Sequence, residues 1–244
     1  LIGIIGALPF ISFVLATLAA PLAAHRFGAR NLAVLSGGFG VGGLALISQA
    51  SDALSLGAGV FICGICTGLM MPALTAAMQA LVSRTMHGRV SSIMNAGTSV
   101  GIIVAVPTVV FLSDAWRLTY TLFAALTAIG VVAAWYFIPS VSRVVPANAA
   151  PPPPITRLQW SRLIRLSLFA FAMGFVSAPY WLFAPDLAVT LGALPPDQTG
   201  WLWFAVGVAG LGGAVVSDLA DRNNPPITQA LMLMMLSSSL ALLA

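Results

Sequence analysis

The sequence contains no lysine and no glutamate, and its 244 residues carry only ten arginines and six aspartates. Charged residues make up 7% of the chain, whereas they make up about a quarter of a soluble domain. So few charges cannot cover a water-facing surface, and we therefore expect a surface that faces lipid. The net charge of +4 comes from arginines between apolar segments, so we do not expect nucleic acid as a partner.

Cysteine and histidine are also scarce, with two residues of each. Cys63 and Cys66 form a C-x-x-C inside an apolar run, but a redox or metal site needs exposure and further ligands. We interpret them as small apolar residues at a helix contact. His25 and His87 lie beside arginines, and no Ser/His/Asp set, H-E-x-x-H motif or phosphate loop is visible. We predict no enzyme activity, no cofactor and no metal site.

Apolar residues make up 59% of the chain, and they form long runs without the alternation that is typical of β-strands. Because a lipid-exposed backbone must satisfy its own hydrogen bonds, runs of about 20 residues predict membrane-spanning helices. The sequence therefore predicts an all-α, polytopic transmembrane bundle. Its eight expected spans cover residues 1–24, 31–50, 53–82, 90–112, 118–138, 163–184, 199–216 and 227–244.

Arginine and aspartate alternate between the loops that join these spans. Nine of the ten arginines fall on one side, and four of the six aspartates fall on the other. Loops rich in arginine face the cytoplasm by the positive-inside rule. We therefore expect a multi-pass protein of the cell inner (plasma) membrane with its arginine-rich loops in the cytoplasm.

Four consecutive prolines begin at Pro151, and such a run favours an extended spacer. We expect a cytoplasmic linker at residues 139–160. It separates an N-terminal half with five spans, residues 1–138, from the start of a C-terminal half with three spans, residues 161–244. The loops at residues 22–26 and 218–222 resemble each other, as expected for a transporter built from two repeated halves.

Residues 21–30 resemble a loop motif of the major facilitator superfamily, G-x-x-x-D-R-x-G-R-R, which joins that family's second and third helices. Arg26, Gly28 and Arg30 match the motif. Three positions depart from it, namely Pro21, His25 and Ala29. His25 stands where the motif has an acidic residue. The charge contact by which this loop ties neighbouring helices together in the family would therefore take a different form here.

Two further stretches carry the resemblance. Asp221 and Arg222 keep the Asp-Arg pair of the motif in a second copy, and residues 89–117 are similar to the region of the family's fifth helix, with Pro107 in the expected place. The resemblance covers most of the chain. It implies a fragment that contains about helices two to nine and that is truncated at both ends.

The resemblance implies a gate at the two copies of the motif, because the loop ties neighbouring helices together in the family's outward-open state. Arginine suits this role since it stays charged and binds carboxylates or helix C-termini through several donors. The alternative is that these arginines only set the topology. The candidate gate residues are Arg26, Gly28, Arg30, Asp221 and Arg222.

Small residues and a proline suggest how the expected span at residues 90–112 packs. Gly97 and Gly101 form a G-x-x-x-G that lets helices approach closely. Pro107 is expected to kink this helix. The residues around Pro107 depart from the family's antiporter signature, so we do not predict antiport.

The family's substrate cavity is lined by its first, fourth, seventh and tenth helices, and the resemblance places the fourth and seventh at residues 53–82 and 163–184. Methionines and aromatic residues form an adaptable apolar wall, unless they pack against helices or lipid or belong to the interfacial aromatic belt. The candidate cavity residues are Met70, Met71, Thr75, Gln79, Phe171, Met173, Tyr180 and Trp181.

No ionisable residue lies clearly at the middle of an expected span, although such residues usually mark coupling sites. Proton or ion coupling then requires groups at the helix ends or in the helices that the fragment lacks, or the carrier is uncoupled. We expect a monomeric secondary active transporter, surrounded by membrane lipid, that moves a small organic solute across the membrane by alternating access. The alternative is a non-transporting receptor or scaffold with a transporter-like fold. A lipid-acting enzyme would need polar residues clustered at one interface, and we find none.

Overall fold

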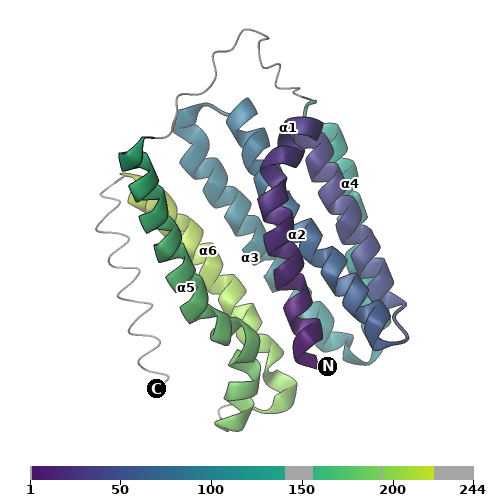
Figure 1. Ribbon diagram of the computed structural model, residues 1–244. Coiled ribbons are helices and arrows are strands. Elements are labelled where there is room, and N and C mark those ends of the chain that lie inside the picture. The colour runs from purple at the N-terminus through teal and green to yellow at the C-terminus, as the bar shows by residue number, and fades with distance from the viewer. Residues whose placement is uncertain (1, 141–155, 193, 223–244) are drawn as a thin grey trace. The chain divides into compact units, whose positions relative to one another are not determined.

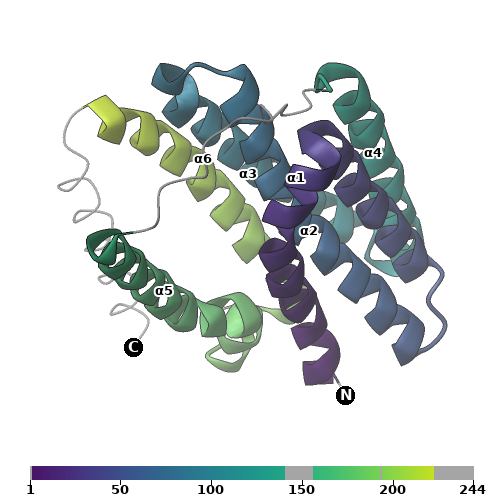
Figure 2. The ribbon, with the colours of Figure 1, turned by 45° about the horizontal axis from the view of Figure 1, so that its top comes forward.

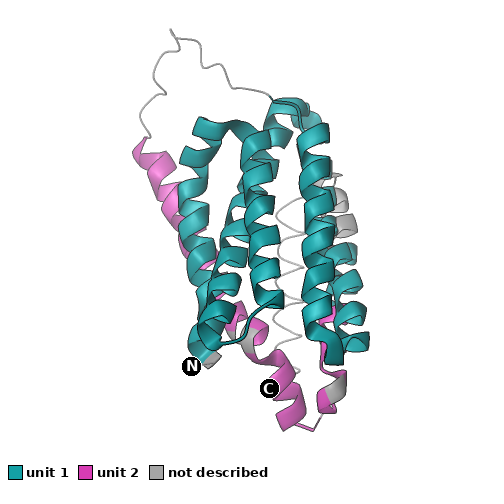
Figure 3. Cartoon of the chain, turned by 90° about the vertical axis from the view of Figure 1, so that its right-hand side faces the viewer, with its two compact units in different colours: residues 1–143, 206–244 teal, residues 144–205 magenta. Residues whose placement is uncertain are grey.

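A computed structural model of the chain describes residues 2–140, 156–192 and 194–222, and every regular element among them is helical (Figure 1). The chain divides into two compact units (Figure 3). Unit 1 comprises residues 1–143 and 206–244, and unit 2 comprises residues 144–205. The expected all-α class is confirmed, and the expected span at residues 227–244 lies outside the described residues.

The first helix, α1 (Ile2–Ser48), folds back on itself at Gly28 (Figures 1 and 2). Gly28 has a φ of 76° and a ψ of 165°, a conformation that residues with a Cβ rarely adopt. The bend divides α1 into a first limb, residues 2–27, and a second limb, residues 29–48. A straight helix of 47 residues would measure about 70 Å, whereas each limb alone can span the roughly 30 Å hydrocarbon core of a bilayer.

The second helix, α2 (Ala53–Leu81), begins with a capping box. The Ser55 backbone N–H donates to the Asp52 carboxylate at 2.8 Å, and the Asp52 backbone N–H donates to the Ser55 hydroxyl at 3.3 Å. These two bonds satisfy N–H groups that have no partner within the helix. They fix the start of α2 directly after the turn that follows α1.

Glycines let α2 approach both limbs of α1 closely. A Cβ on Gly68 would lie 2.7 Å from the Ala16 Cβ of the first limb, and one on Gly59 would lie 2.6 Å from the Ile47 Cγ1 of the second limb. Real Cβ atoms essentially never pack this closely, so the glycines set the spacing of the helices. Close approach of this kind holds membrane helices together through van der Waals contact.

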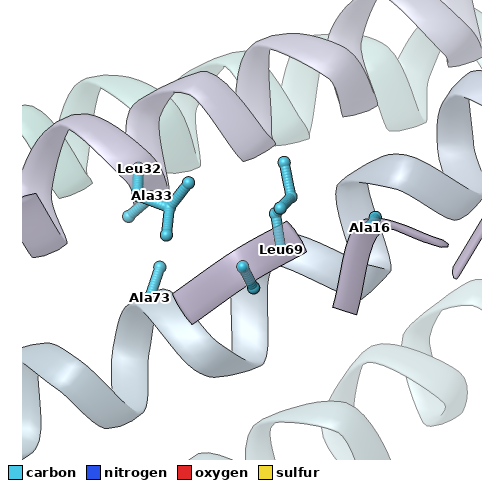
Figure 4. Close-up of a cluster of buried hydrophobic side chains, with 6 residues drawn as sticks. Ala16, Leu32, Ala33, Leu69 and Ala73 are labelled. Atoms are coloured by element: carbon cyan, nitrogen blue, oxygen red, sulfur yellow. The ribbon is translucent and has the colours of Figure 1, made fainter. Parts of the chain in front are cut away.

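Small and branched side chains fill the contact between these helices. Leu32 and Ala33 of the second limb face Ala73 of α2, beside Leu69 and Ala16 (Figure 4). Leu32 and Ala73 are fully buried. The core of unit 1 therefore lies between the two limbs of α1 and α2.

The helix α4 (Trp116–Phe137) also packs against α1. At its start, Arg117 Nη2 donates to the Ala50 carbonyl oxygen at 2.9 Å, and the Arg117 Cζ lies 4.4 Å from the centroid of the Trp116 ring. Ala50 lies just beyond the C-terminal end of α1, where a cation is favourable. This contact gives a structural reason for the single arginine that the sequence places on the aspartate side.

The helix α3 (His87–Phe111) lies between two short 3₁₀ turns, η1 (Arg84–Met86) and η2 (Ser113–Ala115). It runs through Pro107 without a residue that leaves the helical region. Its buried residues are Ser92, Ser99 and Val106.

Unit 2 contains α5 (Arg157–Thr190), the 3₁₀ turn η3 (Pro196–Gln198) and the start of α6 (Gly200–Arg222). The helix α5 begins before the expected end of the linker at residue 160 because Thr156 caps it. The Gln159 backbone N–H donates to the Thr156 hydroxyl at 3.3 Å, and the Thr156 backbone N–H donates to Gln159 Oε1 at 2.9 Å.

In the part of the chain that the structure describes, five helices are long and apolar enough to cross a membrane, and α1 is one of them. Six of the eight expected spans fall on these five helices, because the bend at Gly28 gives α1 two limbs. The expected span at residues 199–216 falls on α6, whose apolar described part is the shorter stretch Gly200–Gly212. The chain is therefore a multi-pass transmembrane protein.

Candidate functional site

A cleft of about 780 Å³ opens in unit 1 between the two limbs of α1 and α2. Its lining residues lie within the ranges 13–31 and 67–80, together with Ser140. The volume falls within the range of about 300–1,000 Å³ that is usual for small-molecule sites. The cleft contains the matched positions of the loop motif together with part of the predicted cavity wall, so it is the strongest candidate site.

The bend of α1 positions the loop motif at the cleft. Arg26, Gly28 and Arg30 all line it, because the left-handed backbone of Gly28 reverses the chain between the two arginines. The second limb begins at residue 29, so the positive end of its helix dipole also lies at the cleft. The structure thus brings the first copy of the predicted gate together on one surface.

The two arginines of the motif have different surroundings. Arg26 is exposed, whereas Arg30 is half-buried and its Cζ lies 4.6 Å from the centroid of the Trp135 ring on α4. Such cation–π contacts hold a guanidinium in a fixed orientation. The Nε atom of Arg30 is buried and has no hydrogen-bond partner among the described residues. One arginine is therefore fixed with an unsatisfied donor, and the other extends at the surface.

The helix α2 supplies the opposite wall. Met71, Thr75 and Gln79 line the cleft, as their spacing of four residues on one helix face requires. Met70 does not line it and packs against the core at the second limb, where its Cε lies 3.9 Å from the position of a Cβ on Gly37. The helical period distinguishes Met70 from the other three, and this signal was available in the sequence.

The lining of the cleft is electrostatically one-sided. Arg26 and Arg30 line it, and among the residues that the structure describes, none of those lining the cleft is an aspartate or a glutamate. A charge with no opposite charge nearby is costly in a low-dielectric setting. The cleft is therefore suited to hold an anionic group.

Several cleft residues were not predicted from the sequence. Phe13, Thr17 and Asn31 line the cleft, and Trp135 holds Arg30 from α4. Thr17 is visible only as a polar residue within an apolar span. The Arg30–Trp135 contact joins residues that are far apart in the chain, so no local sequence pattern predicts it.

The predicted cavity residues of α5 lie in unit 2. Phe171 is exposed and stacks on Phe175, with ring centroids 6.2 Å apart. Trp181 stacks on Trp203 of α6, with centroids 5.3 Å apart and planes 11° apart, and Tyr180 meets the edge of Trp203 at 6.2 Å. The side chain of Met173 lies outside the described part. Tyr180 and Trp181 thus form an aromatic cluster with Trp203 that the sequence did not predict.

The remaining predicted residues have less described around them. Asp221 and Arg222 form the end of α6, and their side chains lie outside the described part. A Cβ on Gly97 or Gly101 would meet no described atom within 4 Å, so their role in packing stays a prediction. No group of three or more potential metal ligands occurs among the described residues. Cys63 and Cys66 pack against Gly43 and Gly40 of the second limb.

The model of the Major Facilitator Superfamily matches residues 1–244. No curated protein and no solved structure matches the chain.

Proposed function

The chain belongs to the major facilitator superfamily of membrane transporters, and on this premise we propose that it is a secondary active transporter that moves a small organic solute by alternating access. The observation that carries the proposal is the position of the Gly28 bend. It brings the two motif arginines to the mouth of a cleft whose other wall is the Met71, Thr75 and Gln79 face of α2.

A gate at this position follows from the different environments of the two arginines. Arg30 is fixed over Trp135, whereas Arg26 is exposed and lines the same cleft. In the proposed cycle, Arg26 engages a carboxylate or helix C-terminus of the other half in one state and releases it in the other. Asp221 and Arg222 are proposed to act in the same way in the second half.

The remaining parts of the proposal concern organisation. The chain is proposed to act as a monomer in the inner (plasma) membrane with its arginine-rich loops in the cytoplasm. Its halves are residues 1–138 and 161–244, joined by a linker at residues 139–160. Coupling to a proton or ion is proposed to use groups at the helix ends if it occurs in this chain, because the expected spans hold no central ionisable residue.

Uptake and efflux of small organic solutes by the full-length protein in proteoliposomes test this proposal. We expect Gly28→Ala to slow transport strongly, because the backbone of Gly28, with a φ of 76° and a ψ of 165°, costs about 1–3 kcal/mol for a residue with a Cβ. Gly42→Ala is the matched control, since Gly42 lies in the second limb of α1 and a Cβ there would meet no described atom within 4 Å. Equal rates in the two variants would show that the bend does not act in transport.

The same preparation separates a carrier from a receptor or scaffold. A carrier moves its ligand into the vesicle lumen, whereas a receptor binds ligand at the surface without accumulation. Binding by equilibrium dialysis and uptake by filtration are therefore measured for each solute that binds. A solute that binds and is never moved across the bilayer would contradict the transporter proposal.

A further inference from the structure

The cleft at the Gly28 bend changes in character along its length. Its α2 wall extends from Thr67 to Ala80, which corresponds to about 20 Å along the helix axis. Arg26, Arg30 and Gln79 lie toward the end with the bend, and Phe13 and Met71 lie toward the other. The cleft is therefore cationic at one end and largely apolar at the other.

The hydroxyl groups at the apolar end are already satisfied. Thr17 donates to the Gly68 carbonyl oxygen at 3.2 Å, and Thr67 donates to the carbonyl oxygens of Cys63 and Gly64 at 2.9 and 3.2 Å. Since these hydroxyl protons serve the backbone, they offer no donor to a ligand. The walls at this end present mainly methyl, thioether and aromatic surface.

The cationic end of the cleft differs from the apolar end in how its hydrogen-bond donors are satisfied. Arg26 and Arg30 have no acidic partner in the lining of the cleft, and the buried Nε of Arg30 has no acceptor among the described residues. The start of the second limb adds the positive end of a helix dipole. An anionic group bound here would accept charge-assisted hydrogen bonds and would offset the positive charge of the half-buried Arg30.

We propose that this cleft binds one amphiphile, with its anionic phosphate or carboxylate head at Arg26 and Arg30 and its apolar tail between the first limb and α2 toward Phe13. The site holds its ligand whether or not the chain transports it, so the inference goes beyond the proposed function. Two sources supply this chemistry, namely an anionic membrane phospholipid and a soluble amphiphilic anion. Arginines at the membrane surface attract both.

Thermal unfolding of the full-length protein in lipid nanodiscs tests the proposal. The discs contain phosphatidylcholine alone, phosphatidylcholine with phosphatidylglycerol, or phosphatidylcholine with added dodecyl phosphate below its micelle concentration. We expect at least one anionic amphiphile to raise the midpoint of unfolding. A shift with phosphatidylglycerol identifies a lipid as the source, a shift with dodecyl phosphate alone identifies a soluble anion, and no shift with either overturns the proposal.

Charge variants test the head-group end. We expect Arg26→Gln to weaken binding of the amphiphile about tenfold, as the loss of one charge-assisted hydrogen bond implies, and Arg30→Gln to weaken it at least as much. Arg84→Gln is the matched control, because exposed Arg84 follows α2 at the same end and does not line the cleft. Since Arg26 is exposed, its variant is expected to fold even if that of Arg30 does not. An equal loss in Arg84→Gln would overturn the site in favour of general surface attraction.

The tail is tested by changing the ligand and the wall separately. Butyl phosphate carries the same head group with a short tail, and we expect it to bind at least tenfold more weakly than dodecyl phosphate. Ala76→Leu adds bulk to the wall of the cleft while keeping its charges, and it is expected to weaken dodecyl phosphate more than butyl phosphate. Equal affinity for both phosphates in the wild-type protein would contradict the amphiphile and leave a site for simple anions.

Discussion

Two helices of unit 1 carry glycines at the same G-x-x-x-G spacing and use them differently. In α2, a Cβ on Gly64 would lie 2.8 Å from the Pro9 Cα of the first limb, and a Cβ on Gly68 would be equally crowded. In α3, Gly97 and Gly101 would gain no described neighbour within 4 Å. The G-x-x-x-G spacing alone therefore indicates that another helix can approach this face closely. It does not indicate that another helix does so.

The difference lies in which face of each helix has a partner. The small residues of α2 meet α1 on two sides, with Gly64 against the first limb and Gly59 against the second. In α3, the buried residue between the two glycines is Ser99, whose carbonyl oxygen would lie 3.2 Å from a Cβ on Gly207 of α6. Ser99 and the G-x-x-x-G pair point to different sides of the helix because residues two positions apart are separated by about 200°.

Matched alanine substitutions test this comparison most directly. We expect Gly64→Ala to lower the free energy of unfolding by about 1–3 kcal/mol, because the added Cβ forces the backbone of the first limb away. Gly97→Ala is expected to raise it by up to about 1 kcal/mol, since alanine is the better helix former and the site is open. Thermal unfolding in a mild detergent measures both.

The sign of the change separates the two environments. Gly101→Ala serves as a second open position and should behave like Gly97→Ala. If Gly97→Ala destabilises the protein as strongly as Gly64→Ala, then α3 has a close partner that the described residues do not include. The contrast between α2 and α3 would then be lost.

Arg117 tests how the C-terminal end of α1 is held. Arg117→Ala removes the bond to the Ala50 carbonyl oxygen and the stack on Trp116. We expect a loss of about 1 kcal/mol, because Arg117 is exposed and water competes for both contacts. Arg117→Lys keeps the charge near the helix end and should recover part of the loss. Identical stability of the lysine and alanine variants would show that the charge contributes nothing.

Much of this fold was predictable because it depends on local sequence. The lengths of the apolar runs predicted the helices, and the break between the first two spans fell on the loop that contains Gly28. The helix α5 begins at Arg157, within the expected linker, because Thr156 and Gln159 form its capping pair next to a polar, proline-rich stretch. The capping signature was present in the sequence but was counted as part of the linker.

The candidate site was less predictable because it depends on contacts between distant segments. The motif match identified Arg26, Gly28 and Arg30, which the cleft brings together. The stack of Arg30 on Trp135 and the hydrogen bond from Thr17 to Gly68 require knowledge of which helices are neighbours. Apolar runs that are hydrophobic on all sides do not indicate which face meets which helix.

Two buried serines allow a second comparison, between a hydrogen bond that joins two helices and a hydrogen bond within one helix. Ser36 of α1 donates to the Cys66 carbonyl oxygen of α2 at 2.8 Å, whereas Ser92 of α3 donates to Gly88 within its own helix at 3.0 Å. We expect Ser36→Ala to cost about 0.6 kcal/mol, a usual value for a bond between membrane helices. Ser92→Ala should cost less, because the Gly88 carbonyl keeps its place in the helix. Equal losses would mean that the bond between helices adds nothing.

The starts of the two helices give the smallest expected effect. The helix α2 begins with the Asp52 cap, whereas α3 begins at Met86 without a side-chain cap. The backbone N–H of Ser55, and then its hydroxyl, lower the pKa of Asp52 below its ordinary value of 3.8. The folded state thus favours the carboxylate, so the stabilisation is fully present above pH 3.8 and is lost as the pH falls further.

Variants of Asp52 make this pH dependence measurable. Asp52→Ala should lower the midpoint of unfolding slightly near neutral pH, and the difference from the wild-type protein should shrink as the pH falls below 3.8. Asp52→Asn keeps a side-chain acceptor that does not titrate, so its difference from Asp52→Ala should not change with pH. If the wild-type protein and Asp52→Ala differ equally at all pH values, the ionised carboxylate does not hold the start of α2.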